Sequence, residues 1–580
     1  MQQTLSQQET MNRRLPIVIG GLLIVSAYLL LQLVSFQQLP ASVVTELNLL
    51  RDASYIRNLT IAAARGLIYD RRGEPLAVNT LEYRIGISPN LVVEPRRVAT
   101  QLASILGLDE LETYEQITSD AVWVQLAGPV DAEIGQQVEA LDLGNMVTIE
   151  RIPRRSYPQG TLAAQVVGFV GGDLRGYYGV EGYYQEQLAG QVREEQISNI
   201  PFDLPQDQAA DHGTNVVLTI DRDVQFVAES ELLRAIAETG ATEGTILVMN
   251  PRNGDILAMA NYPAFDPNAY YDVPDASILL NPAIGEQYEP GSVMKVITMA
   301  SALELGVVTP QDTYIDQGRL EVGGVIIENW DRAAHGVLDM TQILVQSLNV
   351  GAATVSLRMG PENFYTKMHD FGFGRLTGVD LQGEAAGTLH VPGDPDWSES
   401  QLGTNSFGQG IAVTPLQMLT AVNAIANDGL MMQPRVVYQM IDGNQVVTAQ
   451  PSALGRPISA QTADIVTNMM IATVRDGVDR ASVPGYTVAG KSGTAEIPTP
   501  IGYENNAWIM SFVGFLPADD PQVSILIKLD RPTSGRWASQ VVAPIFSRLA
   551  ERLVILLEIP PDDIRQALAS EGGAVNEIQR

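Results

Sequence analysis

The chain has 580 residues and a mass of 62.7 kDa, several times the usual size of one domain, so two or more folded units are expected. Hydrophobic residues make up 45% and charged residues 18%, a globular composition that excludes wholesale disorder and coiled coil as the main architecture. With 36 basic against 67 acidic side chains the formal charge is −31, which disfavours nucleic acid as a principal ligand because phosphates are repelled.

The chain contains no cysteine, which excludes disulfide scaffolds, thiolate zinc sites and cysteine nucleophiles. The four histidines, His212, His335, His369 and His390, show no HxxxH or HExxH spacing. Each is expected to be a structural or surface residue rather than a metal ligand. We therefore expect catalysis without a metal ion or another cofactor.

Lysine is rare in this sequence. Of the 36 basic residues 32 are arginine, and the only lysines are Lys295, Lys367, Lys491 and Lys528. A general preference for arginine as the surface cation would explain the bias. It also makes each remaining lysine a candidate for a role that needs loss of a proton, because arginine stays protonated in proteins.

The N-terminal region contains a long apolar segment. No charged residue lies between Leu15 and Thr45, and Leu15–Phe36 is long enough to cross a bilayer core of ~30 Å as one helix. A cleaved signal peptide is the alternative, but its apolar core is normally only about 7 to 15 residues, and residues 40–42 match a cleavage site poorly. Arg13 and Arg14 favour a cytoplasmic N-terminus, which would place the rest of the chain outside the cell membrane.

The rest of the chain is expected to form two folded domains. A helical stalk over residues 37–64 leads into the first, and the polar stretch Pro201–Gly213 is a plausible linker to the second. The expected parts are a cytoplasmic tail 1–14, a transmembrane anchor 15–36, a stalk and non-catalytic domain 37–206, a catalytic domain 215–557 and a polar tail 558–580.

The second domain begins with a predicted β-hairpin and ends with further strands. Gly244–Asn250 and Asp255–Asn261 are strand-like and are separated by the turn sequence PRNG. A mostly helical middle is followed by three strand candidates, Tyr486–Gly490, Trp508–Phe515 and Val523–Leu529, and by an amphipathic helix near Val541–Leu557. Strands at both ends with helices between them predict one antiparallel sheet closed by the two ends of the domain.

The sequence EPGSVMK, Glu289–Lys295, carries the first chemical motif. Ser292 and Lys295 are three residues apart at the start of a helical pattern, so they share one helix face. A neutral lysine could take the hydroxyl proton and make Ser292 a nucleophile, provided that burial or a nearby cation such as Lys491 lowers the lysine pKa from about 10.4. An incidental pair on a solvated helix is the alternative, but no other lysine follows a serine at this spacing.

Two later motifs fit the same chemistry. In QSLN, Ser347 could relay protons and Asn349 could hold a substrate amide, although both residues are also common at helix ends. In AGKSGTAE, Lys491, Ser492 and Thr494 can bind a carboxylate, and Gly493 lets a substrate lie along the strand. Taken alone each is better explained by local structure, but the three in this order favour the catalytic interpretation.

The order SxxK, SxN, KSG(T) resembles the penicillin-binding protein and serine β-lactamase superfamily. This sequence has SLN and KSGT where SDN and KTG also occur, variations that the family accommodates. Three segments of the first domain are similar to the non-catalytic region of class B penicillin-binding proteins: RGLIYDRRGEPLA (65–77), RSYPQGTLAAQVVGFVG (155–171) and GVEGYYQEQLAG (179–190). The resemblance covers residues from about 15 to 555.

The resemblance implies an α/β (α+β) transpeptidase fold, a five-stranded antiparallel sheet with helices on both faces, beside a mixed α/β pedestal domain and one transmembrane helix. It implies a monofunctional peptidoglycan D,D-transpeptidase in which Ser292 attacks the D-Ala-D-Ala carbonyl of a stem peptide and a neighbouring amine resolves the acyl-enzyme. Lys295 would be the base, Ser347 the proton relay, and Asn349 a peptide contact. The carboxylate would bind Lys491, Ser492 and Thr494, with an oxyanion hole of backbone N–H groups from Ser292 and Thr494.

Further expectations follow from the same resemblance. Penicillin should acylate Ser292, and Tyr503, Trp508 and the SFGQG loop of Ser406–Gly410 should line or support the cleft. Glycan polymerisation would fall to a polytopic glycosyltransferase partner of the shape, elongation, division and sporulation class, because residues 37–206 resemble a pedestal and not a glycosyltransferase. A role in division and a role in elongation both stay open.

Three other functions share the serine and lysine motifs. A D,D-carboxypeptidase or β-lactamase would pass the acyl group to water, but the large anchored first domain disfavours a secreted hydrolase. A β-lactam sensor would need a signalling domain inside the cell, where only about 14 residues are expected. A scaffold that keeps the fold without catalysis is disfavoured by the intact motifs.

Overall fold

The computed structural model describes residues 2–37, 56–61, 63–190, 193–198, 212–499 and 502–568. The chain forms two compact units, one of residues 1–63 and 191–211 and the other of residues 64–190 and 212–580. Most of the predicted linker after Pro201, and residues 569–580 of the predicted polar tail, lie outside the described residues.

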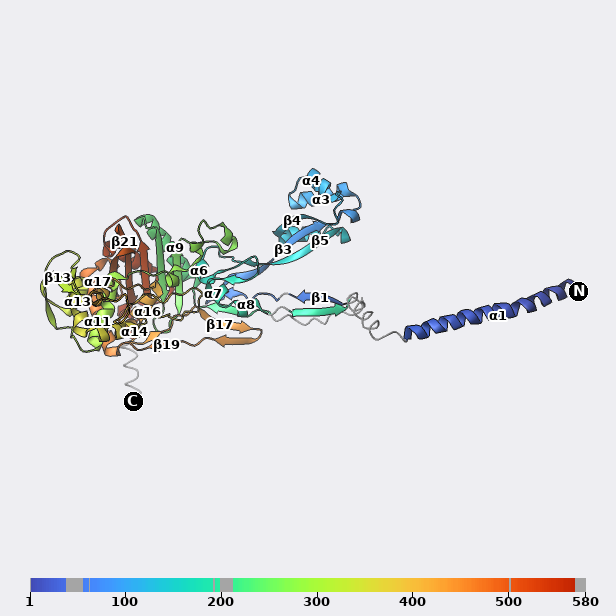
Figure 1. Cartoon of the computed structure of the whole chain (residues 1–580). Coiled ribbons are helices and arrows are strands. Elements are labelled where there is room, and N and C mark those ends of the chain that lie inside the picture. The colour runs from blue at the N-terminus through green and yellow to red at the C-terminus, as the bar shows by residue number, and fades with distance from the viewer. Residues whose placement is uncertain are drawn as a thin grey trace. The chain divides into compact units, whose positions relative to one another are not determined.

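The first unit contains one long helix and a pair of strands. Helix α1 spans Gln2–Gln37, and β1 (Ile56–Ile61) pairs antiparallel with β8 (Arg193–Ser198) (Figure 1). The helical stalk predicted over residues 37–64 is therefore wrong at its C-terminal end, because strand β1 forms by pairing with a segment distant in sequence; residues 38–55 lie outside the described part. Within the described residues, no helix has both the length and the apolar character that a membrane crossing requires.

The second unit contains a five-stranded antiparallel sheet in the order β11-β10-β22-β21-β20. The predicted hairpin is present as β10 (Glu243–Met249) and β11 (Ile256–Tyr262), and β21 (Gly502–Leu516) and β22 (Val523–Asp530) contain the two later strand candidates. Strand β20 runs from Ala489 to Thr499. The strand predicted from Tyr486 therefore begins too early, and the KSGT sequence lies within the strand, where pairing with β21 outweighs the low strand propensity of its glycines.

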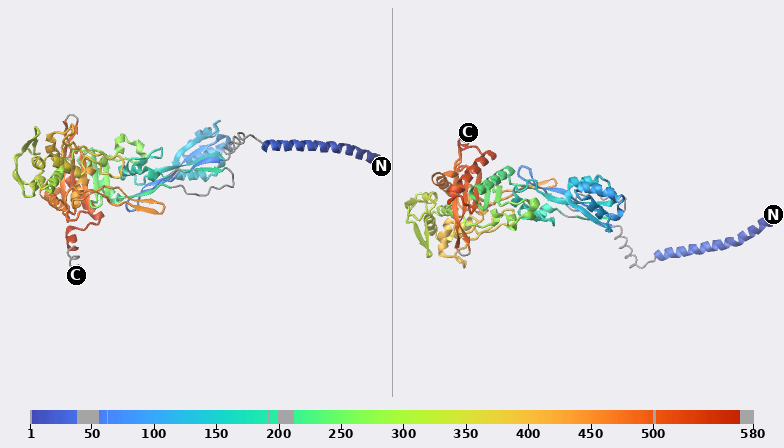
Figure 2. Two further views of the ribbon diagram at one scale, coloured as in Figure 1. Left: turned by 60° about the horizontal axis from the view of Figure 1, so that its bottom comes forward. Right: turned by 90° about the horizontal axis from the view of Figure 1, so that it is seen from above.

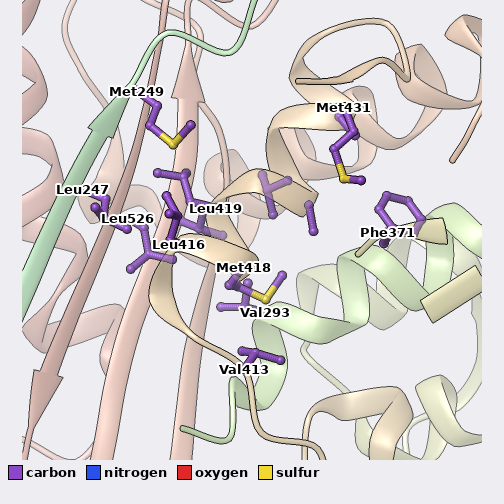
Figure 3. Packing of buried hydrophobic residues seen from close by; sticks show 14 of the residues in the cluster. Leu247, Met249, Val293, Phe371, Val413, Leu416, Met418, Leu419, Met431 and Leu526 are labelled. Carbon is purple, nitrogen blue, oxygen red and sulfur yellow. The ribbon is translucent and has the colours of Figure 1, made fainter. Parts of the chain in front are cut away.

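Successive residues of the central strands face two separate hydrophobic cores. Leu247 and Met249 lie in one buried cluster, whereas Ile246 and Val248 lie in the other, as the two-residue period of a strand requires. Figure 3 shows the first core, where Leu416 and Leu419 lie close to the sheet. The first face is covered by α11 (Met294–Glu304) and α16 (Pro415–Ala426), and the second by α9 (Arg222–Thr239) and α19 (Ala543–Leu556).

The segment between β11 and β20 is mostly helical and carries small strand pairs. Its other helices are α10 (Pro282–Gly285), α12 (Met340–Val345), α13 (Asn349–Met359), α14 (Pro361–Asp370), α15 (Glu399–Thr404) and α17 (Ala460–Gly477). Its short strands are β12 (Thr313–Asp316), β13 (Arg319–Val322), β14 (Val325–Glu328), β15 (Gly336–Asp339), β16 (Met431–Met432) and β19 (Ala453–Gly455).

A second sheet combines strands from both sides of the predicted domain boundary. Its order is β18-β17-β9-β2-β3-β4, and β5 also pairs with β3. Strand β9 (Asn215–Leu218) pairs parallel with β2 (Ile68–Tyr69), so the sequence after residue 214 begins in this sheet and not in the five-stranded one. The other strands are β3 (Pro75–Ile87), β4 (Val124–Asp131), β5 (Val147–Ser156), β17 (Val437–Asp442) and β18 (Gln445–Thr448).

Helices cover the β3, β4 and β5 part of this sheet. Tyr83, Ile85 and Ile87 of β3 point into a small core that includes Val98 and Leu102. Figure 2 shows the helices of this region, in blue, against these strands from two further directions. They are α3 (Pro95–Leu106), α4 (Glu110–Ile117) and α5 (Ala132–Glu139), and three short helices follow, α6 (Ala164–Val167), α7 (Gly179–Tyr183) and α8 (Gln185–Ala189).

The three first-domain segments that carry the sequence resemblance meet in one buried ionic cluster. Glu181 of α7 is fully buried and accepts hydrogen bonds from Arg65 Nε at 2.6 Å and Arg155 Nε at 2.7 Å. Arg155 also donates to the Asn79 side chain at 2.9 Å, and the Tyr157 hydroxyl donates to Glu181 at 3.3 Å. One carboxylate thus joins the three segments, and its partners Arg65 and Arg155 are 116 and 26 residues away in the sequence.

We predict that Glu181→Gln destabilises the fold by about 3 to 5 kcal/mol, because it leaves two guanidinium groups around a buried site without their counter-charge. Glu186→Gln, an exposed substitution five residues later, is the matched control and should change stability by at most about 0.5 kcal/mol. Urea unfolding of both variants measures the difference. Equal stability of the two variants would show that the cluster contributes nothing.

Candidate active site

Ser292 lies in a tight turn at the start of a buried helix. The turn is the 3₁₀ helix η5 (Gly291–Val293), which continues into α11, so the Ser292 hydroxyl is near the positive end of the helix dipole. Gly291 has φ +56°, and a Cβ there would lie 2.9 Å from the Thr494 carbonyl oxygen. Glycine is required at Gly291 because the turn packs directly against the backbone of β20.

Gly493 of β20 makes the same close approach from the other side. A Cβ at this position would lie 2.8 Å from the Pro290 carbonyl oxygen and 2.9 Å from Val293 Cγ2. The structure therefore gives Gly493 a packing role against the Ser292 turn, whereas the sequence suggested only space for a substrate. Gly291 in the turn and Gly493 in strand β20 therefore allow the KSGT sequence to lie close to Ser292.

Lys295 extends from the first turn of α11 and is buried, with 1% of its surface exposed. Its Nζ donates to the Ser347 carbonyl oxygen at 2.5 Å, to Asn349 Oδ1 at 2.8 Å and to Ser347 Oγ at 3.3 Å. Burial, and next the charge of Lys491, hold the pKa of Lys295 well below its usual value. A lysine in this environment can be neutral and act as a base.

The connection between α12 and α13 presents Ser347 to both lysines. Ser347 has φ +56°, a left-handed conformation that costs a non-glycine residue about 1 to 3 kcal/mol and is common at functional sites. Asn349 is the first residue of α13. Its side chain accepts a hydrogen bond from Lys295 and donates one from Nδ2 to the Glu328 carbonyl oxygen at 3.0 Å. Asn349 therefore orients Lys295 in addition to its expected contact with substrate.

Lys491 of β20 also contacts Ser347. Its Nζ donates to Ser347 Oγ at 3.0 Å and to the Ser492 carbonyl oxygen at 3.0 Å, and it too is only 1% exposed. Burial lowers the pKa of Lys491 to about 7. Because Lys295 also has the charge of Lys491 beside it, we infer that Lys295 loses its proton first and that the pair carries one positive charge near neutral pH.

These groups surround a cavity of about 510 Å³. Six of the predicted site residues line it: Ser292, Ser347, Asn349, Lys491, Ser492 and Thr494. Lys295 and Gly493 do not line the cavity. Lys295 contacts Ser347, and Gly493 packs against the Ser292 turn. The Thr494 hydroxyl oxygen accepts from the Ala538 backbone N–H at 3.1 Å, which connects β20 to the next wall of the cavity.

Sequence reasoning missed two aromatic residues of this cavity. Trp330 and Trp537 line it with their ring centroids 5.1 Å apart at 71°, and Trp330 is 50% exposed. His335, which was expected to be structural or at the surface, also lines the cavity and contacts Asp331 at 3.0 Å. The scarcity of tryptophan, five in the chain, was the available signal, but the two residues meet only in the folded structure.

The other predicted cleft residues divide into two groups. Tyr503, near the start of β21, and Gly410, in the SFGQG loop, both donate to the buried carboxylate of Glu289, at 3.2 Å and 2.9 Å. Glu289 thus connects both segments to the chain three residues before Ser292. Burial raises the pKa of Glu289. Trp508 instead packs against the core of α9 and α19 and does not line the cavity.

Comparison with known proteins identifies two domains. Residues 244–551 match the family model for the penicillin binding protein transpeptidase domain, and residues 60–199 match the penicillin-binding protein dimerisation domain. The chain is 34% identical over 531 residues to stage V sporulation protein D of Bacillus subtilis, covering 89% of this chain and 82% of that protein. It is 32% identical over 530 residues to a probable peptidoglycan D,D-transpeptidase, PbpC, of Pseudomonas aeruginosa, covering 89% and 91%.

A solved structure shows the same architecture. Penicillin-binding protein 3 of Mycobacterium tuberculosis, complexed with aztreonam, superposes with a TM-score of 0.68 at 30% identity, covering 87% of this chain and 98% of that one. The segments that carry Lys295 and Lys491 thus lie in a chain whose fold is similar to that of a protein solved with bound aztreonam.

We predict a bell-shaped pH dependence for acylation of Ser292, measured as the second-order rate constant with a carboxylate-bearing chromogenic β-lactam, which reports the free enzyme. The rate falls with decreasing pH as Lys295 takes up a proton, and falls with increasing pH through about 7 as Lys491 loses its proton. Lys491→Ala should react more slowly and lose the alkaline limb. An unchanged alkaline limb in that variant would exclude Lys491 as its source.

Proposed function

Because the chain belongs to the penicillin-binding protein transpeptidase family, we propose that it is a peptidoglycan D,D-transpeptidase acting through an acyl-serine intermediate on Ser292. The observation that carries this proposal is the meeting of two buried lysines, Lys295 and Lys491, on Ser347 beside the cavity that Ser292 lines. Hydrogen bonds thus join a base, Lys295, and a cation, Lys491, to a proton relay, Ser347, and the relay lines the same cavity as Ser292.

In the acylation step Ser292 Oγ forms a bond to the carbonyl carbon between the two terminal D-alanines of a donor stem peptide. Neutral Lys295 takes the hydroxyl proton and the amide C–N bond breaks. Ser347 gives its proton to the departing nitrogen of D-alanine and regains one from Lys295. An amine of a neighbouring stem peptide then attacks the ester carbonyl. A new amide forms and Ser292 recovers its proton, so no oxidant or cofactor takes part in the step.

The carboxylate of the donor peptide is bound by KSGT. Protonated Lys491 supplies the charge, and the Ser492 and Thr494 side chains line the same cavity and supply hydroxyl groups. Backbone N–H groups of Ser292 and Thr494 stabilise the oxyanion, and loss of one such donor typically costs about 100- to 1000-fold in rate. β-Lactams acylate Ser292 by the same attack, in keeping with the aztreonam complex of the related structure.

A D,D-carboxypeptidase or β-lactamase activity is the main alternative, since it needs only water in place of the amine. The match of residues 60–199 to a dimerisation domain favours the transpeptidase, because this region adds a second domain found in the penicillin-binding proteins. A non-catalytic β-lactam sensor would also be acylated, but it would not turn over a stem peptide.

The proposal extends to the cellular setting. Leu15–Phe36 anchors the chain in the cell membrane with a cytoplasmic N-terminus and an extracytoplasmic catalytic domain, and the uncharged sequence from Leu15 to Thr45 supports this. Glycan polymerisation is left to a polytopic glycosyltransferase partner, since the two matched domains are a transpeptidase and a dimerisation domain. The process served is cell-wall biogenesis in division or elongation.

The full-length protein, incubated with a peptide ending in D-Ala-D-Ala and an amine acceptor, should form the cross-linked product in an amount that rises with acceptor concentration. Ser292→Ala should form none, whereas Ser534→Ala, an exposed control, should match the wild type. Mass spectrometry of the products separates the alternatives. Only the hydrolysed peptide would indicate a carboxypeptidase, and β-lactam acylation without peptide turnover would indicate a sensor.

A further inference from the structure

A second cavity, of about 430 Å³, lies outside the catalytic site. It shares no lining residue with the Ser292 cavity. Its walls are largely aromatic and aliphatic, with Tyr178, Tyr262, Ile278 and Leu280 among them, and two carboxylates, Glu243 and Glu286, also line it. A mostly apolar cavity with a few convergent polar groups is the usual form of a small-molecule site.

Three carboxylates and one lysine meet at the acidic wall of this cavity. Glu243, Glu286 and Asp530 each offer an oxygen within 4.8 Å of the others. Lys528 Nζ lies 2.5 Å from Asp530 Oδ2 and 3.2 Å from Glu286 Oε2, and it lies 5.5 Å from the centre of the Tyr288 ring. Among these four groups, three negative charges against one positive charge leave a formal excess of two, and the nearby Arg531 is itself paired with Glu504.

Two buried polar atoms beside the acidic wall lack hydrogen-bond partners among the described residues. Asp530 is 3% exposed, and its second oxygen, Oδ1, has no hydrogen-bond partner among the described residues. The buried hydroxyl of Tyr288, next to Lys528, also lacks a partner there. Glu243 forms no ion pair with the described residues, although it lines the cavity. Asp530 and Tyr288 do not line the cavity, so Glu243 is the carboxylate of the wall that is available to a bound ligand.

The carboxylates of the wall have raised pKa values. Burial, and then the charges of Glu286 and Asp530, raise the pKa of Glu243. Burial, opposed by Lys528, also raises the pKa of Asp530. Burial is the main cause of both shifts, and the neighbouring carboxylates add to it.

The type of cation follows from the surroundings. A divalent metal ion prefers six or more oxygen ligands, and the ammonium group of Lys528 repels a doubly charged ion more strongly than a singly charged one. A primary ammonium group needs only one or two carboxylates, as Lys528 itself shows at Glu286 and Asp530. The Tyr178 and Tyr262 rings in the wall suit an organic cation, because aromatic faces attract ammonium groups and cover apolar carbon.

We propose that this cavity binds a small organic amine, with its primary ammonium group held by Glu243 and Glu286 and its apolar part between the tyrosine and aliphatic walls. The site is distinct from the catalytic cavity and does not depend on the proposed reaction. Glu286 and Ser292 are six residues apart in sequence, so the site adjoins the segment that leads to the nucleophile.

The test is titration calorimetry of the full-length protein with 2-phenylethylamine as the probe and 2-phenylethanol as its uncharged counterpart. Wild type should bind the amine saturably and the alcohol at least tenfold more weakly. Glu243→Gln and Glu286→Gln should each weaken amine binding at least tenfold. Glu551→Gln, an exposed carboxylate of α19, is the matched control and should bind like the wild type.

Four results would overturn the proposal: no saturable binding of the amine, equal binding of the alcohol, unchanged affinity in both glutamine variants, or Ca²⁺ binding that is abolished by those variants and displaces the amine. The last would identify a metal site. Circular dichroism of each variant establishes that it is folded, and because Glu243 and Glu286 are tested separately, failure of one variant to fold still leaves the other to decide.

Discussion

The chemistry of this protein depends on two buried lysines that share one hydroxyl group, that of Ser347. Ser347 Oγ accepts from Lys295 at 3.3 Å and from Lys491 at 3.0 Å, and both lysines are almost fully buried. Burial disfavours two charges so close together, so one lysine gives up its proton. The neutral lysine is the base and the charged one is the carboxylate anchor. An arginine at position 295 could not be the base, because it keeps its proton.

The fold keeps the two lysines in place by packing backbone against backbone. Gly291 and Gly493 let the Ser292 turn and strand β20 approach to distances at which any Cβ would collide. Behind them, alternate residues of the central strands enter two cores, so the sheet is fixed from both faces. Fully burying one Leu, Ile, Val or Met side chain stabilises by about 1.5 to 3 kcal/mol. The burial of these side chains offsets the free-energy cost of the strained Ser347 backbone and of the buried lysines.

Much of the site could be predicted from sequence, because its chemistry lies in three short motifs and because lysine is rare enough to make Lys295 and Lys491 conspicuous. The hairpin β10–β11 was predictable because its two strands are neighbours in the sequence and a short turn joins them. Features that depend on contacts between distant segments could not be predicted. Strand β1 was expected to be helical, and the pairing of β9 with β2 was not expected. Trp330 and Trp537 are far apart in the sequence and come together only in the folded chain. The separation of Trp508 from the cavity likewise depends on which face of β21 it occupies, and the packing decides that.

The most direct test of the divided roles is intact mass spectrometry after incubation with penicillin, comparing wild type with Ser292→Ala, Lys295→Arg and the control Lys367→Arg. Lys367 is bonded to Asp370 and the Pro457 carbonyl, away from the cavity, so its replacement should leave acylation intact. The account predicts a stable adduct on wild type and Lys367→Arg, and none on Ser292→Ala or Lys295→Arg. An adduct formed on Lys295→Arg at the wild-type rate would contradict it, since a side chain that keeps its proton cannot be the base.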